Sequence, residues 1–254
     1  MDRNTLRYCY PLGFATVTAT QHDTESGGLP YRRTVQRYDN DNIYRQGLLR
    51  EEATLTAAGD TLGRTVNIYR TLNPATMAPA SYTRFFSGRL WTAPAQVTEY
   101  LYEEGGRLAM EKQFAHDAWG NVERYVETPG DDPAGQVTVT AAYRHDHSRY
   151  LHVLPESVEV ASRGEGTLRR RRASYDERGN MTQLVQAIDA GGAEAVTDFT
   201  YDATGNITGV TRPANYKGQR LRYAFTYDDA LHTLVTGVED SYGYASSTEY
   251  DYRW

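Results

Sequence analysis

The feature that most constrains the fold of this chain is a two-residue motif, Tyr followed by Asp, that recurs along the sequence. Tyr175, Tyr201 and Tyr227 each begin such a pair and lie 26 residues apart. Further Tyr-Asp or His-Asp pairs begin at Tyr38, His116, His145 and Tyr250. A period of about 20 to 50 residues is typical of arrays in which each unit is one supersecondary element. The spacing therefore predicts a repeat protein.

Each unit has the pattern of a β-hairpin. In residues 221–227, LRYAFTY, large apolar or aromatic side chains alternate with small or polar ones, which is typical of a strand. The turn sequences DERGN and DATGN then place an aspartate where its carboxylate can accept backbone amides, and a glycine where a positive φ costs little. The predicted turn residues are Asp117, Gly120, Asn121, Tyr175, Asp176, Gly179, Asn180, Tyr201, Asp202, Gly205, Asn206, Tyr227 and Asp228.

The composition agrees with strands and turns rather than helices. The chain has 254 residues, with 21 Tyr against six Phe, and 22 Gly. Tyrosine suits a half-buried surface, because its ring packs while its hydroxyl keeps a polar partner. The nearest candidate for a helix, residues 92–112, contains Pro94 and the Gly105–Gly106 pair, which argue against a long one. Loops are expected at residues 73–81 and 127–136, and hairpin tips at residues 22–30 and 189–195.

Charge and cysteine content argue against several classes of protein. The formal net charge is −6 with acids and bases interspersed, which does not support a nucleic-acid surface. Cys9 is the only cysteine, so the chain has no intrachain disulfide and no cysteine-based zinc site. No run approaches the roughly 18 apolar residues of a membrane span. The N-terminal segment lacks the apolar core of a signal peptide.

Three of the turn segments carry a family resemblance. YDERGNMTQL, YDATGNITGV and HDAWGNVERY resemble the YD repeats of the RHS family, which includes the B and C components of bacterial Tc toxins and RHS polymorphic toxins. The resemblance covers about residues 115–254, the predicted hairpin repeats. Residues 1–114, with YPLGFATV and YRQGLLREEATL, look like the diverged strand region that precedes the repeats in Tc B-component-like and SpvB-like proteins. Both ends are expected to be cut from a larger protein.

The resemblance implies an all-β fold in which antiparallel hairpins form a curved or spiralling sheet, part of a hollow shell. Such a shell encloses or presents a toxin or effector polypeptide and is a container rather than an enzyme. The implied partners are the remainder of the shell, its enclosed polypeptide and a pore-forming or secretion component. The implied location is outside the cell or at its surface, as part of a larger bacterial protein. No cofactor is implied.

Two other functions remain open from the residues alone. A tyrosine-rich repeat surface can bind glycans or a receptor, because exposed rings stack on sugar faces and extended repeats offer long surfaces. An enzyme is suggested only by the cluster His145, His147 and His152, in which His145 and His147 would share one face of a strand as a metal-ligand pair. Since His145-Asp146 occupies the position of a Tyr-Asp pair, we interpret it as a repeat turn and predict no metal site.

The remaining motifs receive structural interpretations. The four arginines 169–172 divide between two faces of a strand and are expected to be solvated. The segment 131–136, DDPAGQ, superficially resembles a motif of the RHS family's self-cleaving core, but it lacks the leucine of that motif and is predicted to be a turn. The glycosylation sequons at Asn180 and Asn206 are by-products of the repeat. The repeated aspartates lie one per hairpin, whereas acid-base catalysis needs groups at a common centre, so no catalytic residue is predicted.

Overall fold

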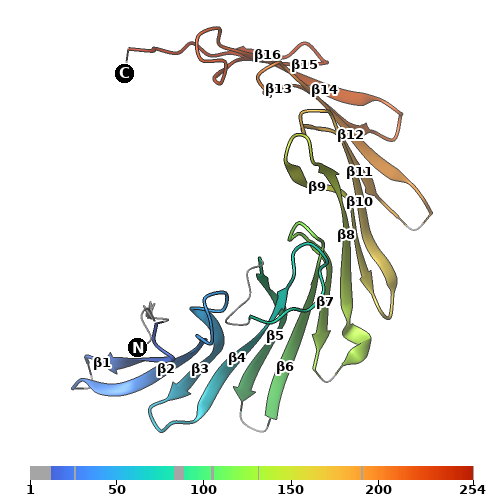
Figure 1. The fold of residues 1–254 in the computed structure, drawn as a ribbon. Coiled ribbons are helices and arrows are strands. Elements are labelled where there is room, and N and C mark those ends of the chain that lie inside the picture. The colour runs from blue at the N-terminus through green and yellow to red at the C-terminus, as the bar shows by residue number, and fades with distance from the viewer. Residues whose placement is uncertain are drawn as a thin grey trace, which may run out of the picture. The chain divides into compact units, whose positions relative to one another are not determined.

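A computed structural model of the chain describes residues 13–25, 27–82, 89–103, 106–130, 132–189 and 191–253. Within these residues the structure is β-sheet apart from one short 3-10 turn, so the predicted all-β class is confirmed (Figure 1). No helix among them has the length and apolar character needed to cross a bilayer. The first strands are β1 (Thr16–Asp23), β2 (Leu29–Asp39), β3 (Leu48–Thr56), β4 (Thr61–Leu72), β5 (Trp91–Glu103), β6 (Gly106–His116) and β7 (Val122–Pro129). After the 3-10 turn η1 (Pro133–Gly135) come β8 (Val137–Asp146), β9 (Leu151–Ser162), β10 (Gly166–Tyr175), β11 (Met181–Ala187), β12 (Glu194–Tyr201), β13 (Ile207–Ala214), β14 (Arg220–Tyr227), β15 (Val235–Asp240) and β16 (Ala245–Ser247).

The order of the strands in the sheet is the order of the strands in the sequence, from β1 to β16. The residue registers from β1 to β7 and from β9 to β16 are all antiparallel. Antiparallel neighbours can be joined by tight turns, so a chain of this kind is a succession of hairpins. The predicted antiparallel hairpin arrangement is therefore confirmed.

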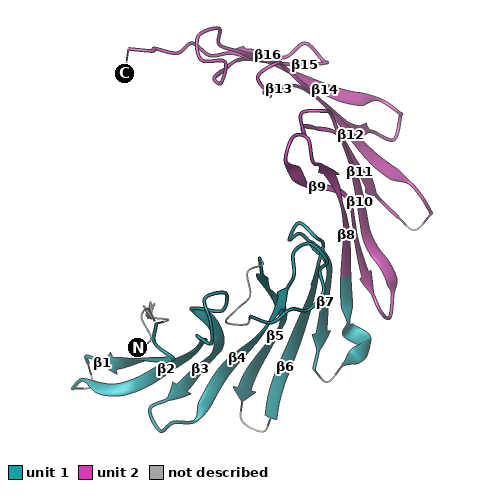
Figure 2. Ribbon diagram, in the orientation of Figure 1, with its two compact units in different colours: residues 1–138 teal, residues 139–254 magenta. Residues whose placement is uncertain are grey.

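The chain divides into two compact units, residues 1–138 and residues 139–254 (Figure 2). Strands β1 to β7 and the turn η1 belong to the first unit, and β8, which begins at Val137, continues into the second. The second unit holds every Tyr-Asp pair after Tyr38, including the C-terminal pair at Tyr250, which follows β16. The start of the repeats predicted at residue 115 lies inside the first unit, at the end of β6.

The segment around residue 130 differs from the prediction of a loop at residues 127–136. That prediction is wrong for Glu127–Pro129, which complete β7, whereas Pro133–Gly135 form η1, in agreement with the turn predicted at residues 131–136. The Asp132 carboxylate accepts the amide of Ala134 at 3.0 Å and so caps the start of the 3-10 turn. This local hydrogen bond favours the turn over an irregular loop. Asp131 and Cys9 lie outside the described residues.

Residues 92–112 form parts of β5 and β6, in agreement with the arguments against a long helix. Pro94 is accommodated at a β-bulge. Ile68 of β4 pairs with Gln96 while Tyr69 pairs with Pro94, so Ala95 is the extra residue in β5. A bulge is one of the few places where a strand tolerates proline, because a ladder hydrogen bond is already missing there.

A β-bulge also stands beside each Tyr-Asp or His-Asp turn whose register is known. The register shifts by one at the last residue of the incoming strand, or at the last but one for the pairs His22-Asp23 in β1 and Tyr38-Asp39 in β2. The shift leaves one extra residue on the return strand. Tyr201, for example, pairs with Ile207 while Thr200 pairs with Gly209, so Thr208 is the extra residue. The extra residues are Tyr31, Arg50, Glu123, Thr182, Thr208 and Thr236. The threonines of the two sequons are therefore bulge residues.

Few side chains in the described residues are fully enclosed. The buried apolar side chains are Ala53, Leu72, Leu90, Ala93 and Val126, and none of them is large and completely covered. Contacts between elements run between neighbours in the sheet, and between β7 and η1. Each unit is therefore a single layer, in which most apolar side chains are half-buried by the residues beside them.

Candidate functional site

The Tyr-Asp turns are the feature that the chain repeats most faithfully, and the turn at Asp176 shows their construction. One carboxylate oxygen of Asp176 accepts the amides of Arg178 at 2.8 Å and Asn180 at 2.9 Å. The other accepts the side-chain amide of Asn180 at 3.0 Å. Gly179 has φ +89°, a conformation that glycine adopts without steric cost. The aspartate thus closes a five-residue turn while glycine supplies the required backbone angle.

Asp117 and Asp202 build the same turn. The carboxylate of Asp202 accepts the amides of Thr204 and Asn206, both at 2.9 Å, and the Asn206 side chain at 2.9 Å. The carboxylate of Asp117 accepts the amide of Trp119 at 2.8 Å and both amides of Asn121 at 2.9 and 2.8 Å. Gly120 and Gly205 have φ +90° and +93°. The three turns, which were predicted from the same sequence motif, therefore share one hydrogen-bond pattern.

Two turns lack the glycine and reach a positive φ by other means. Asp228, which is 4% exposed, accepts the amides of Leu231, Thr233 and Leu234 at 2.5, 3.1 and 2.9 Å in a longer turn. His232 takes φ +55° there. In the turn after β8, Asp146 accepts the amides of Ser148 and Arg149, and Tyr150 takes φ +59°. The aspartate is thus the constant element of the turn.

The sequence reasoning missed two turns of the same kind. Asn215, after β13, accepts the amides of Lys217 and Gln219 at 2.9 and 3.0 Å. Asp240, after β15, accepts the amides of Tyr242 and Tyr244 at 2.8 and 3.0 Å. Neither follows a Tyr, but each has a glycine three residues later, at Gly218 and Gly243, with positive φ. The general signal is Asp or Asn followed after two residues by Gly.

The tyrosines of the motif connect one hairpin with the hairpin before it. The hydroxyl of Tyr201 donates to the carbonyl of Met181 at 2.8 Å, and the hydroxyl of Tyr227 donates to that of Ile207 at 2.9 Å. Tyr250 donates to Val235 at 2.9 Å. Each acceptor is the first residue of the preceding return strand. Burial raises the pKa of Tyr201, and the charge of Asp176 raises it further. The Tyr201 hydroxyl therefore stays protonated and remains a donor.

Neighbouring turns of the second unit are also bonded to one another. Arg178 donates to the carbonyl of Ala203 at 2.5 Å, and Asn206 donates to the carbonyl of His232 at 2.5 Å. Arg149 forms an ion pair with Glu177 at 3.2 Å. We call the turns that begin at Asp146, Asp176, Asp202 and Asp228 the turn row. Its members are held together by side chains as well as by the strands between them.

The carboxylates of the turn row are committed to the backbone. The pKa of Asp176 and of Asp202 is lowered, chiefly by the hydrogen bonds from Asn180 and Asn206, and backbone amides add to the effect. General acid-base catalysis works best with a group whose pKa lies near the operating pH. These carboxylates remain ionised and already accept several hydrogen bonds, so the arrangement favours a structural role.

The same shifts predict that acid weakens the repeats. The folded-state pKa of Asp176 and Asp202 lies below the ordinary carboxyl value near about 4. Their hydrogen bonds therefore stabilise the fold above about pH 4, and this stabilisation is lost as the pH falls toward the folded-state pKa. We expect the urea midpoint of the protein to drop between about pH 5 and pH 3. In Asp202→Asn, whose amide oxygen still accepts backbone amides but does not titrate, the drop should be smaller. An unchanged pH slope in this variant would contradict the assignment.

The histidine cluster differs from its predicted arrangement. His145 is in β8, but His147 lies beyond the strand end, in the turn, because the Asp146 carboxylate stops the strand there. The expectation that these two share a strand face is therefore wrong. Both rings instead contact His152, with ring centres 5.7 and 5.3 Å apart. Within the described ranges no group of three or more His, Cys, Asp or Glu residues is arranged to hold a metal ion.

The four arginines 169–172 lie in β10 and are exposed. Arg172 forms an ion pair with Glu194 of β12 at 2.6 Å. This pair joins side chains that are 54% and 30% exposed, and pairs of this kind contribute at most about 1 kcal/mol. The arginine run is thus a solvated part of the sheet.

Two turns of the turn row, those at Asp176 and Asp202, lie in a segment that matches a known sequence family. The model of the RHS Repeat family matches residues 175–217. The matched segment begins at Tyr175, includes the turns at Asp176 and Asp202, and ends inside the turn that Asn215 opens. The resemblance to the RHS family that was inferred from the sequence motif of the turns is confirmed.

Several solved structures are similar to the chain. The crystal structure of TcdB2-TccC3-TEV matches with 12% identity and a TM-score of 0.35, over 91% of this chain and 14% of that one. TcdB2-TccC3 without its hypervariable C-terminal region matches with 12% identity and a TM-score of 0.34, over the same shares. A porin-like protein from Bacteroides uniformis ATCC 8492 matches with 12% identity and a TM-score of 0.35, over 94% of this chain and 95% of that one. The chain thus spans about one seventh of the TcdB2-TccC3 chains. No curated protein matches it.

Proposed function

We propose that this chain is a non-catalytic wall segment of an RHS-type shell that encloses or presents a toxin or effector polypeptide. The observation that carries the proposal is the RHS repeat in a single-layer sheet. A sheet normally buries its apolar face against another layer. Here, in the described part of the second unit, the strand residues Val153 of β9 and Leu168 of β10 are 68% and 46% exposed. A covering layer from the enclosed polypeptide or from the remainder of the shell would bury them.

The repeated contacts suit a wall. Sequential antiparallel pairing leaves no strand edge exposed between one hairpin and the next, and exposed edges are where chains pair wrongly. The tyrosine hydroxyls and the turn row add bonds from each hairpin to its neighbour. A wall built in this way can be extended by one hairpin at a time. The larger protein, secreted or at the cell surface, would supply the rest of the shell, the enclosed polypeptide and a pore-forming or secretion component.

Limited proteolysis of the whole protein that contains this chain tests the proposal. We expect a polypeptide segment outside the RHS region to stay intact under native conditions and to be digested once the sheet is destabilised. Gly209→Ala combined with Gly237→Ala serves as the destabilised variant, and Gly106→Ala as its matched control. If the segment is digested equally fast in all three proteins, the shell proposal fails and a glycan- or receptor-binding module is favoured instead.

A further inference from the structure

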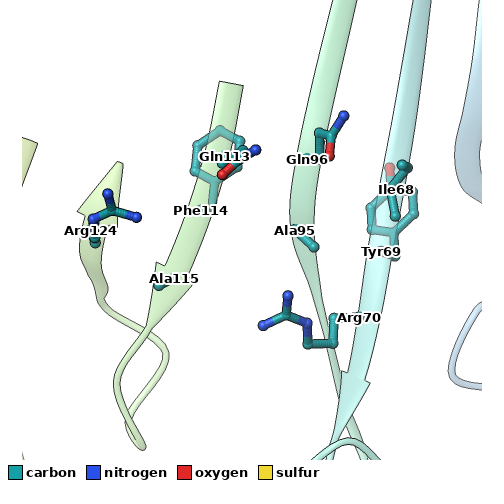
Figure 3. Close-up of a pocket in the computed structure, with 9 residues that line it drawn as sticks. All are labelled: Ile68, Tyr69, Arg70, Ala95, Gln96, Gln113, Phe114, Ala115 and Arg124. Atoms are coloured by element: carbon teal, nitrogen blue, oxygen red, sulfur yellow. The ribbon is translucent and has the colours of Figure 1, made fainter. Parts of the chain in front are cut away.

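The first unit carries a groove on the sheet face formed by β4, β5, β6 and β7, which lies far from the turn row in the sequence. Its volume is about 430 Å³, and its lining includes Ile68, Arg70, Ala95, Ala115 and Arg124 (Figure 3). The register explains why these side chains meet. Ala115 pairs directly with Arg124, and directly paired residues project from the same face. Arg70 and Ile68 are both on β4. They are two residues apart and therefore lie on the same face of the sheet.

The shape of the groove follows from small side chains between two long ones. Ala95 and Ala115 are on the two central strands, and arginines stand on the outer strands β4 and β7. Figure 3 shows the guanidinium group of Arg70 extending from β4 toward the central strands, with Arg124 on β7 beyond Ala115. Ala95 is the extra residue of the bulge in β5, and bulges frequently stand next to sites because they redirect neighbouring side chains.

The two arginines of the groove, Arg70 and Arg124, are without a carboxylate in an ion pair within the part of the chain that the structure describes. Glu111, on the same face of β6, accepts the amides of Gln96 at 3.1 Å and Gln113 at 2.6 Å. Burial lowers the pKa of His116, the charges of Asp117 and Glu123 oppose this shift, and the charge of Arg70 adds to it, so the field of this arginine reaches the end of β6.

We propose that this groove is a binding site for an oxyanion, the carboxylate or phosphate group of a ligand. Arg70 and Arg124 hold the group from two sides. Guanidinium groups suit this task because their planar N–H donors match two oxygens of a carboxylate or phosphate at once. Ala95 and Ala115 leave room for the group over the central strands. Ile68, which is 49% exposed, offers an apolar contact for the part of the ligand that carries the anion.

The test uses two probes, inorganic phosphate and acetate, titrated at low ionic strength into the intact protein labelled with ¹⁵N-arginine. We expect saturable shifts of the Arg70 and Arg124 side-chain resonances with at least one probe. The tighter probe identifies the chemical group. Arg70→Gln and Arg124→Gln should each weaken binding by about tenfold or more, since each removes charge-assisted hydrogen bonds.

Two further variants separate the groove from general charge effects. Arg50→Gln removes one positive charge from an exposed position of β3 in the same unit, and it should leave the affinity within about twofold because screened surface charges contribute little. Ala115→Leu keeps both arginines but fills the groove, and it should abolish binding. The proposal is overturned if the native protein shows no saturable shift with either probe, if Arg50→Gln weakens binding as much as Arg70→Gln, or if Ala115→Leu binds normally.

Discussion

Alanine in place of Gly209 is expected to lower the free energy of unfolding by about 1 to 2 kcal/mol, although alanine is normally the better strand residue. A Cβ atom at Gly209 would lie 2.6 Å from the Oγ1 atom of Thr200, its direct partner on β12. Forced contacts of this kind cost about 1 to 3 kcal/mol, and the lower backbone entropy of alanine returns only part of that. Chemical denaturation with two-state analysis measures the difference.

The repeat supplies an internal check of this prediction. Gly237 on β15 faces Thr226 in the same way, with a Cβ-to-Oγ1 distance of 2.6 Å, so Gly237→Ala should behave like Gly209→Ala. Gly106 has open space around its Cβ position and a φ outside the left-handed region, so Gly106→Ala should be neutral or slightly stabilising. The pair Thr200→Ala with Gly209→Ala should be more stable than the sum of the single effects predicts. If the two changes are simply additive, the contact is not the cause.

Removing the ring of Tyr227 is expected to destabilise the protein by about 2 kcal/mol, and removing only its hydroxyl by about 1 kcal/mol. The ring is half-buried, so Tyr227→Ala costs less than the substitution of a fully buried aromatic residue. Tyr227→Phe leaves the carbonyl of Ile207 without its hydroxyl donor. Hydrogen exchange should show the loss first at the amides of β13 and β14, because the bond joins these two hairpins.

Tyr216 is the matched control for the hydroxyl. It is 91% exposed, in the turn after β13, and Tyr216→Phe should change stability by less than about 0.5 kcal/mol. An equal effect of Tyr216→Phe and Tyr227→Phe would show that the measured change does not come from the bond between hairpins.

The turns could be predicted from the sequence because their contacts are local. Asp176, Gly179 and Asn180 act within five residues, and the turn chemistry of Asp and Gly is general. The alternation of side chains in residues 221–227 is also a local pattern, and it correctly predicted the strand β14. The turns at Asn215 and Asp240 follow the same chemistry, but neither is preceded by a tyrosine, so the Tyr-Asp motif does not reveal them.

Other features depend on register and were out of reach. The acceptor of the Tyr201 hydroxyl, Met181, lies 20 residues away, and only the pairing of β11 with β12 brings the two together. The groove between Arg70 and Arg124 depends on the registers of four strands and on a bulge at Ala95. A shift of one residue in any pair would move side chains to the other face of the sheet. The position of His147 beyond its strand depended on where Asp146 ends β8.

The turn amides carry a consequence for making this protein in eukaryotic cells. The Nδ2 atoms of Asn180 and Asn206, which a glycosyltransferase would modify in their sequons, are the atoms that donate to Asp176 and Asp202. Thr182 and Thr208, the residues that complete the sequons, are held in bulges. A folded turn therefore shields both nitrogens. A sugar added in the secretory pathway before folding would prevent the turn from closing, so cytoplasmic expression, or threonine-to-valine changes in the sequons, would avoid the conflict.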